Sequence, residues 1–174
     1  AGLYELSRRY LANEPAPLAE SMLAWKRNPS GLVGFGLLSI LAGTVWQVVS
    51  VVIVATMYKG NALVPRDMMI EVLVNPQHYL MFFIYLCTGG ALAAVVFALS
   101  VVSMPMLVDR RCDLVCALAT SVNAVAANPL PLALWAAIIM VLTGLGFATA
   151  LLGLVVVMPW LGHASFHAYK DLVD

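Results

Sequence analysis

Three long runs without a charged residue constrain this chain more than any other feature. The runs cover residues 32–57, 79–108 and 128–162. Each is longer than the roughly 20 residues that an α-helix needs to cross a hydrocarbon core about 30 Å thick. Only 10% of the 174 residues are charged, and the mean hydropathy is +0.95. The sequence therefore predicts an all-α integral membrane protein and excludes an ordinary soluble domain.

The distribution of basic residues predicts the orientation in the membrane. Two basic residues, Lys59 and Arg66, lie between the first and second runs. The other seven lie before the first run, between the second and third runs, or after the third: Arg8, Arg9, Lys26, Arg27, Arg110, Arg111 and Lys170. Since basic residues concentrate on the cytoplasmic side, we expect both termini to be cytoplasmic and residues 58–78 to form an external loop. The net charge is zero, so nothing indicates binding to nucleic acid.

The third run is long for one crossing of the membrane and short for two. An internal repeat favours two crossings, because three residues before the first run recur one hundred positions later: Ser21, Asn28 and Pro29 match Ser121, Asn128 and Pro129. We expect the turn near residues 144–146. This predicts four transmembrane helices in two parallel hairpin repeats, residues 1–108 and 109–174. A single crossing remains the alternative.

Each repeat is expected to begin with an amphipathic helix at the membrane surface. Apolar and polar residues alternate at helical spacing before Asn28 and again between Asp109 and Asn128. Asparagine followed by proline is typical of a helix start, since the asparagine side chain accepts from free first-turn amides and proline fits the first helical position. Both Asn-Pro pairs therefore predict the start of a membrane helix.

Four polar residues occupy matching positions after two Met-Pro motifs: Asp109 and Asp113 follow the first, and His163 and His167 follow the second. Residues four apart lie on one face of a helix, so packed repeats would bring two carboxylates toward two imidazoles. Such a ligand set suits Zn²⁺, Mn²⁺ or Fe²⁺. The alternative is structural, with the aspartates paired to nearby basic residues and the histidines at the level of the lipid headgroups.

The remaining motifs argue against catalysis and transport. The sequence contains no nucleophile–base arrangement, phosphate-binding loop or zinc protease motif, and the centres of the apolar runs lack the ionisable residues of a proton or ion pathway. Small residues such as Gly89, Gly90 and Ala93 permit close approach of helices. We therefore expect a non-catalytic protein that binds the lipid bilayer and a membrane-protein partner or a second copy. A transporter is the least favoured alternative.

Several segments resemble a family of bacterial integral membrane proteins that is classed as a domain of unknown function. The resemblance is carried by YELSRR (residues 4–9), SMPMLVDR (103–110), residues 121–129 and PWLGHA (159–164). Some members are labelled putative cytochrome c oxidase subunit, which implies a bacterial inner membrane location and a respiratory oxidase as host complex. The chain resembles the C-terminal two-thirds of such proteins. A further upstream repeat would make Glu5 the counterpart of Asp113 and His167.

Overall fold

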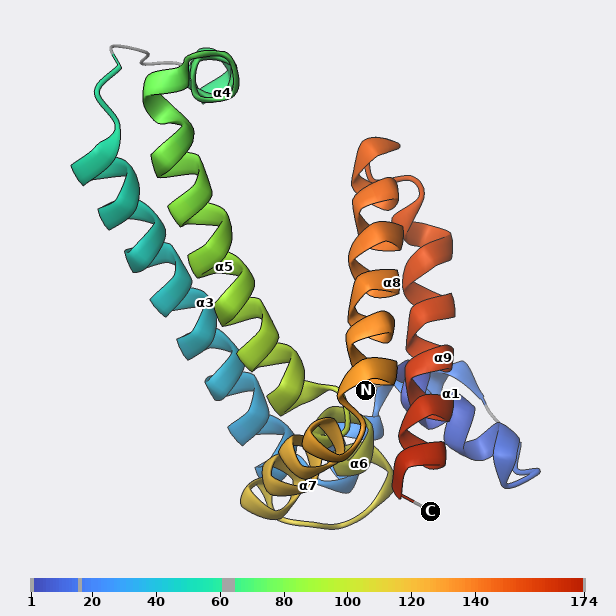
Figure 1. Cartoon of the computed structure of the whole chain (residues 1–174). Coiled ribbons are helices and arrows are strands. Elements are labelled where there is room, and N and C mark those ends of the chain that lie inside the picture. Colours follow the sequence, from blue (N-terminus) through green and yellow to red (C-terminus); the bar gives the residue numbers. More distant parts are fainter. Residues whose placement is uncertain (1, 16, 61–64, 174) are drawn as a thin grey trace. The chain divides into compact units, whose positions relative to one another are not determined.

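The computed structural model describes residues 2–15, 17–60 and 65–173, and these residues form helices joined by short connections (Figure 1). The elements in chain order are α1 (Gly2–Leu11), α2 (Leu18–Met22), η1 (Ala24–Arg27), α3 (Pro29–Met57), α4 (Pro65–Val74), η2 (Pro76–His78), α5 (Tyr79–Ser100), α6 (Ser103–Asp109), α7 (Leu114–Ala127), α8 (Pro129–Ala148) and α9 (Leu154–Val173). No strand occurs in the described residues, so the predicted all-α class is confirmed.

The chain divides into two compact units, each of which is described by itself. One unit combines residues 1–36 with 97–174, and the other is residues 37–96. These limits differ from the predicted repeat boundary between residues 108 and 109. The division into units does not test the repeats, which remain a prediction.

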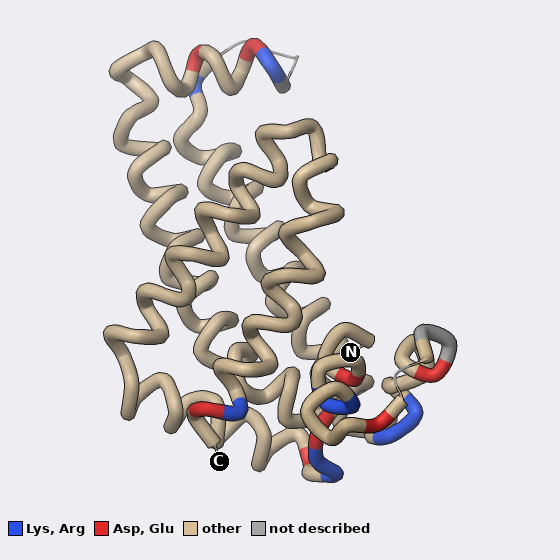
Figure 2. The backbone as a smooth tube through the Cα atoms, turned by 90° about the vertical axis from the view of Figure 1, so that its right-hand side faces the viewer, with Lys and Arg blue, Asp and Glu red and all other residues tan. Residues whose placement is uncertain are grey.

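Three segments are long and apolar enough to cross a membrane: Pro29–Met57, Pro76–Asp109 and Pro129–Ala148. Figure 2 shows Lys, Arg, Asp and Glu on the short helices, the connections and the C-terminal end of α9, and α3, α5 and α8 carry none. Helices that are apolar around their whole circumference are expected where the solvent is lipid. The integral membrane character is therefore supported, while a total of four crossings remains a prediction.

The third apolar run folds as a helical hairpin, with α8 and α9 packed together (Figure 1). The turn lies between Ala148 and Leu154, not at residues 144–146 as predicted. Gly146 belongs to α8, where its lack of a side chain makes room for Leu154 of α9. Gly146 therefore serves helix packing, and the turn itself uses Ala150 and Leu151 at φ 52° and 72°.

Both Asn-Pro pairs stand at helix starts, as predicted, and α3 and α8 begin at the two prolines. Asn28 Oδ1 accepts a hydrogen bond from the backbone N–H of Gly31 at 3.1 Å, which satisfies a free first-turn amide of α3. Asn128 makes no such cap, and its Nδ2 donates to the carbonyl of Ala124 at 3.3 Å. The shared sequence pair thus starts both helices but uses its asparagine in two ways.

The core of the unit of residues 1–36 and 97–174 lies where α6, α7 and α9 meet. Val102, Leu107, Phe166 and Tyr169 are each 0% exposed there. α1 packs against α9, and the ring of Tyr4 stacks on that of Phe166 with centroids 6.2 Å apart. The predicted surface segments are thus helical, as α1, α2 and η1 before the first run and as α7 before the last.

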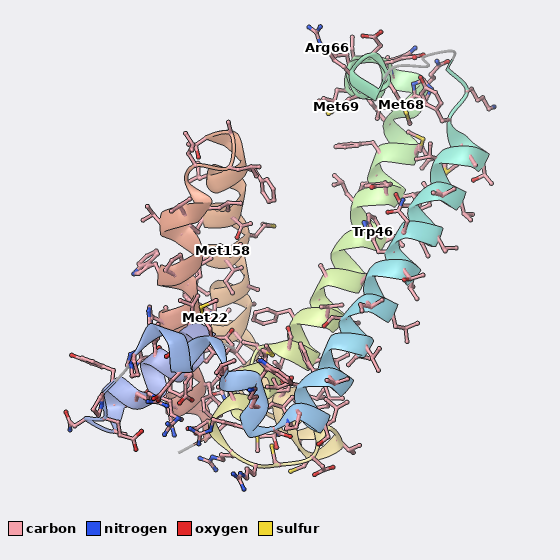
Figure 3. The ribbon with its side chains drawn as sticks, turned by 180° about the vertical axis from the view of Figure 1, so that it is seen from behind. Met22, Trp46, Arg66, Met68, Met69 and Met158 are labelled. Atoms are coloured by element: carbon pink, nitrogen blue, oxygen red, sulfur yellow. The ribbon has the colours of Figure 1, made fainter. Side chains whose placement is uncertain are left out.

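In the unit of residues 37–96, side chains of α3 and α5 meet around one tryptophan. Trp46 of α3 (Figure 3) meets Tyr85 edge to face with ring centroids 4.9 Å apart, and Ser50 Oγ donates to Tyr85 Oη at 3.0 Å. A Cβ atom at Gly89 would lie 2.8 Å from the Trp46 ring. The expected loop of residues 58–78 contains α4 and η2, and its residues 61–64 lie outside the described part.

Candidate functional site

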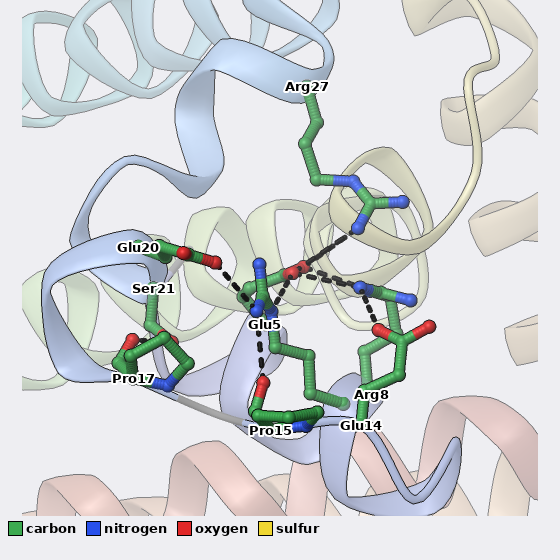
Figure 4. Close-up of polar contacts among 9 residues, drawn as sticks. Glu5, Arg8, Glu14, Pro15, Pro17, Glu20, Ser21 and Arg27 are labelled. Carbon is green, nitrogen blue, oxygen red and sulfur yellow. Dashed lines mark hydrogen bonds and ion pairs between the residues drawn. The ribbon is translucent and has the colours of Figure 1, made fainter.

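A buried carboxylate on α1 collects three arginines. Glu5 is 1% exposed and lies one turn before Arg8 and Arg9, so the three side chains share one region of the helix surface. The carboxylate accepts hydrogen bonds from Arg8 Nη2 at 2.9 Å and from Arg9 Nε at 2.8 Å. Arg27 Nη1 from η1 adds a longer contact at 3.2 Å (Figure 4). The cluster therefore ties α1 to the segment that leads into α3.

The arginines determine the charge state of Glu5. Burial alone would raise the pKa of this carboxyl, but the hydrogen bonds from Arg8 and Arg9 and the charge of Arg27 outweigh it and lower the pKa to about 2. Two exposed acids complete the cluster, since Arg8 also pairs with Glu14 at 3.1 Å and Arg9 with Glu20 at 2.8 Å. Three arginines thus face three glutamates, so the cluster is balanced in charge and its geometry is that of a structural tie.

Asp109, the first of the predicted metal ligands, is held by two side chains of α9. Its Oδ2 accepts a hydrogen bond from Tyr169 Oη at 2.9 Å and another from Lys170 Nζ at 2.8 Å. Burial and then the neighbouring Asp109 raise the pKa of the Tyr169 phenol. This carboxylate joins the end of α6 to α9, in agreement with the structural alternative for Asp109.

Asp113 lies in a different place from the one that the spacing suggested. α6 ends at Asp109 and α7 begins at Leu114, so the two aspartates do not share a helix face, and that expectation is wrong. Asp113 is the N-cap of α7, where its Oδ2 accepts from the backbone N–H of Cys116 at 3.3 Å. An aspartate at this position stabilises a helix start by satisfying a free amide.

The two histidines do share a helix face, because α9 is continuous through both. His163 Nδ1 and the hydroxyl of Ser7 form a hydrogen bond of 2.6 Å between α9 and α1. His163 and His167 line a cavity of about 430 Å³ together with Leu6, Ser7 and Tyr10. The structure thus brings the histidines together at the α1–α9 contact, while each aspartate is bonded elsewhere.

The described residues contain no group of three or more His, Cys, Asp or Glu side chains close enough to hold a metal ion. The Asp/His metal site therefore stays a prediction, with two of its four members adjacent. No described cysteine forms a disulfide.

Sequence reasoning missed the two closest polar contacts of α1. The resemblance predicts Glu5 only as a repeat counterpart, although Arg8 and Arg9 lie three and four positions beyond it, which is the spacing of helical ion pairs. The contact of Ser7 with His163 spans 156 positions. No local pattern could have indicated it, since it depends on how α1 packs on α9.

A comparison with protein families finds one match. Residues 1–109 match the sequence model of a family described as predicted integral membrane protein (DUF2189). The match ends with the last residue of α6. No curated protein and no solved structure matches the chain.

Proposed function

The chain belongs to the DUF2189 family of predicted integral membrane proteins, and we propose that it is a non-catalytic subunit that binds a larger membrane complex as an accessory or assembly partner. The contacts of its ionisable side chains support this function. Glu5 and Asp109 hold helices together, and Asp113 caps one. In this arrangement the polar groups stabilise the fold and leave the apolar helix surfaces for binding.

The observation that carries the proposal is a groove between α3 and α5, inside the unit of residues 37–96. Its volume is about 510 Å³. Small residues make up much of its lining, namely Ala42, Gly43, Gly89, Gly90 and Ala93. Interfaces between membrane helices are enriched in such residues because they let two backbones approach closely. A groove of this kind fits one membrane helix of a partner protein.

The glycines of the groove differ in what they face. Gly89 faces the Trp46 ring and serves the packing of α3 on α5. A Cβ atom at Gly43 or Gly90 would have no heavy atom within 4 Å. Packing inside the unit therefore does not require glycine at these two positions, and because both line the groove they are available for contact with another helix.

The test is a pull-down of the tagged full chain from membranes dissolved in a mild detergent. A Gly90→Leu variant fills the groove with a bulky side chain, and we expect it to lose the co-purifying partner. Gly144→Leu is the matched control, since Gly144 lies on α8 and also faces open space. Equal recovery of partner with both variants would overturn the groove as binding surface, and purification of the wild-type chain alone would overturn the function.

A respiratory oxidase is the host that the resemblance of the sequence favours. Haem absorbance in the co-purified material would support that host, and partner subunits without haem would contradict it. We also propose that the complex lies in the bacterial inner membrane with both termini of this chain in the cytoplasm. Labelling of Lys59 by a membrane-impermeant amine reagent in intact spheroplasts tests this orientation, because Lys59 is then external.

Metal binding is the second candidate function. It is favoured by one observation, namely that His163 and His167 line the same cavity. Imidazole nitrogen is a common ligand of Zn²⁺ and Fe²⁺, and two imidazoles four residues apart on a helix can bind one ion. This candidate requires further ligands beyond the two histidines.

A further inference from the structure

His78 is buried without a partner for either of its ring nitrogens. The residue is 1% exposed, and neither Nδ1 nor Nε2 forms a hydrogen bond. A neutral imidazole carries one donor and one acceptor, and leaving them unsatisfied costs free energy. Buried polar groups are nearly always bonded, so an orphaned one calls for an explanation.

The surrounding segment holds His78 firmly in this position. Asn75 Oδ1 accepts from the backbone N–H of Gln77 at 3.2 Å, which fixes the turn before α5. The imidazole stacks on the Tyr58 ring with centroids 5.1 Å apart, and Tyr58 Oη donates to Glu71 at 2.7 Å. The ring is thus clamped from one side, and its orphaned nitrogens are not the result of an exposed, freely rotating side chain.

His78 lines a cavity of about 400 Å³ whose other polar lining is rich in donors. Lys59 and Gln77 contribute an ammonium and an amide, and no acidic residue lines the cavity. Among the described residues, none forms an ion pair with Lys59. An excess of donors beside a cation suits an oxyanion and disfavours a metal cation.

The rest of the cavity wall is apolar except for Thr56, whose hydroxyl donates to the carbonyl of Val52 at 2.7 Å. Met57, Leu80 and Met81 belong to it, and they lie at the last residue of α3 and in the first turn of α5. The cavity therefore lies where two membrane-length helices end, which is the level of the lipid headgroups. A lining that combines hydrogen-bond donors with apolar side chains matches an amphiphile with an acidic head.

From these observations we propose that the cavity lined by Lys59, Gln77 and His78 binds a phosphate group, with Met57, Leu80 and Met81 beside the apolar part of the molecule that carries it. A phospholipid headgroup and free inorganic phosphate share this chemistry. The site lies in the unit of residues 37–96 and is separate from the groove proposed for a partner helix.

The experiment is native mass spectrometry of the full chain in a neutral glycoside detergent, with three added probes. These are short-chain phosphatidylglycerol, inorganic phosphate, and a diacylglycerol of the same chain length that lacks phosphate. We expect one phosphatidylglycerol to bind and diacylglycerol not to bind. Saturation by inorganic phosphate alone would assign the site to the free ion, and binding of the lipid alone would assign it to a headgroup.

Two variants and a matched control locate the site. His78→Phe keeps a ring to stack on Tyr58 but removes both nitrogens, and Lys59→Gln removes the cation. We expect each to weaken phosphatidylglycerol binding about tenfold, the effect of losing a charge-assisted hydrogen bond. Arg66→Gln removes an exposed cation from α4 that does not line the cavity (Figure 3), and its affinity should stay within about twofold of wild type.

The outcomes separate this site from general attraction to anionic lipid. Equal weakening in all three variants, wild-type affinity in Lys59→Gln, or binding of diacylglycerol as tight as that of phosphatidylglycerol would each overturn the proposal. If His78→Phe does not fold, the ¹⁵N shifts of the His78 ring in the wild-type chain replace it. They should move on addition of the phosphate probe, and unchanged shifts would overturn the proposal.

Discussion

Ser7 and His163 lie 156 positions apart, and their side chains form a hydrogen bond of 2.6 Å that joins α1 to α9. Ser7 is 2% exposed and His163 is partly exposed, so this bond is partly buried. Its location beside the stacked rings of Tyr4 and Phe166 makes it the polar part of a contact that is otherwise apolar. The two helices are therefore held in one register by this pair.

Removing the hydroxyl should loosen that contact. We expect Ser7→Ala to lower the free energy of unfolding by about 0.5–1.5 kcal/mol, because the partly buried hydrogen bond to His163 Nδ1 is lost. The measurement is denaturant unfolding of the protein in detergent micelles. Ser30→Ala is the control, since Ser30 is exposed on α3 and its loss should change stability by less than about 0.5 kcal/mol. Equal effects of the two substitutions would contradict a special role for Ser7.

The Glu5 cluster predicts a particular dependence of stability on pH. The pKa of Glu5 is lowered in the folded protein to about 2 from an ordinary value of 4.5. A carboxyl with a lowered folded-state pKa stabilises the fold above its unfolded pKa and loses this effect as the pH falls through the folded one. We therefore expect the contribution of Glu5 to the free energy of unfolding to be constant above about pH 5 and to fall between pH 4.5 and 2.

Substitution of Glu5 separates this contribution from those of other acids. Glu5→Gln should destabilise the protein by about 3–5 kcal/mol at neutral pH, since it leaves three arginines around an uncharged group. The fall in the free energy of unfolding between pH 4.5 and 2 should become shallower in this variant. Glu14→Gln is the matched control, because Glu14 is 50% exposed and a surface pair contributes less than about 1 kcal/mol. A wild-type slope in Glu5→Gln would refute the assignment.

Much of the fold follows from local physical chemistry that the sequence displays. Charge-free runs must be helical in lipid, because every backbone amide needs a partner inside the segment. The Asn-Pro pairs located the starts of α3 and α8 because proline is favoured at the first position of a helix. These features depend on neighbouring residues alone, so they can be predicted without knowing how the helices pack.

The predictions that were wrong concern features that depend on how the helices pack. Gly146 lies within α8 and not in a turn because Leu154 of the next helix occupies the space beside it. Asp109 and Asp113 are four apart, but the helix ends between them, and spacing defines a face only within one continuous helix. His163 and His167 meet that condition on α9. The shared helix face is therefore present for the two histidines and absent for the two aspartates, and the metal site itself stays a prediction.

Asp109 is expected to act as a tie between α6 and α9. Asp109→Asn removes the ion pair with Lys170 and weakens the hydrogen bond from Tyr169, and we expect a loss of about 1–3 kcal/mol in unfolding free energy. The pKa of Tyr169 should fall toward its ordinary value in this variant, as followed by ultraviolet titration of the phenol, although burial keeps part of the shift. Asp171→Asn is the control at an exposed position. An unchanged Tyr169 titration would contradict the contact.

The metal hypothesis predicts bound Zn²⁺, Mn²⁺ or Fe²⁺ in the purified protein, lost when the histidines are replaced. His167→Ala is the sharper substitution, because His163 also holds Ser7 and Asp113 caps α7, so changes at either disturb the fold as well. Elemental analysis of the detergent-purified chain should find about one metal ion per chain in the wild type and none in His167→Ala. His78→Phe is the matched control, as it removes a histidine from the other unit. Metal that is absent from the wild type, or retained in His167→Ala, would leave His163 and His167 as polar contacts of the α1–α9 interface.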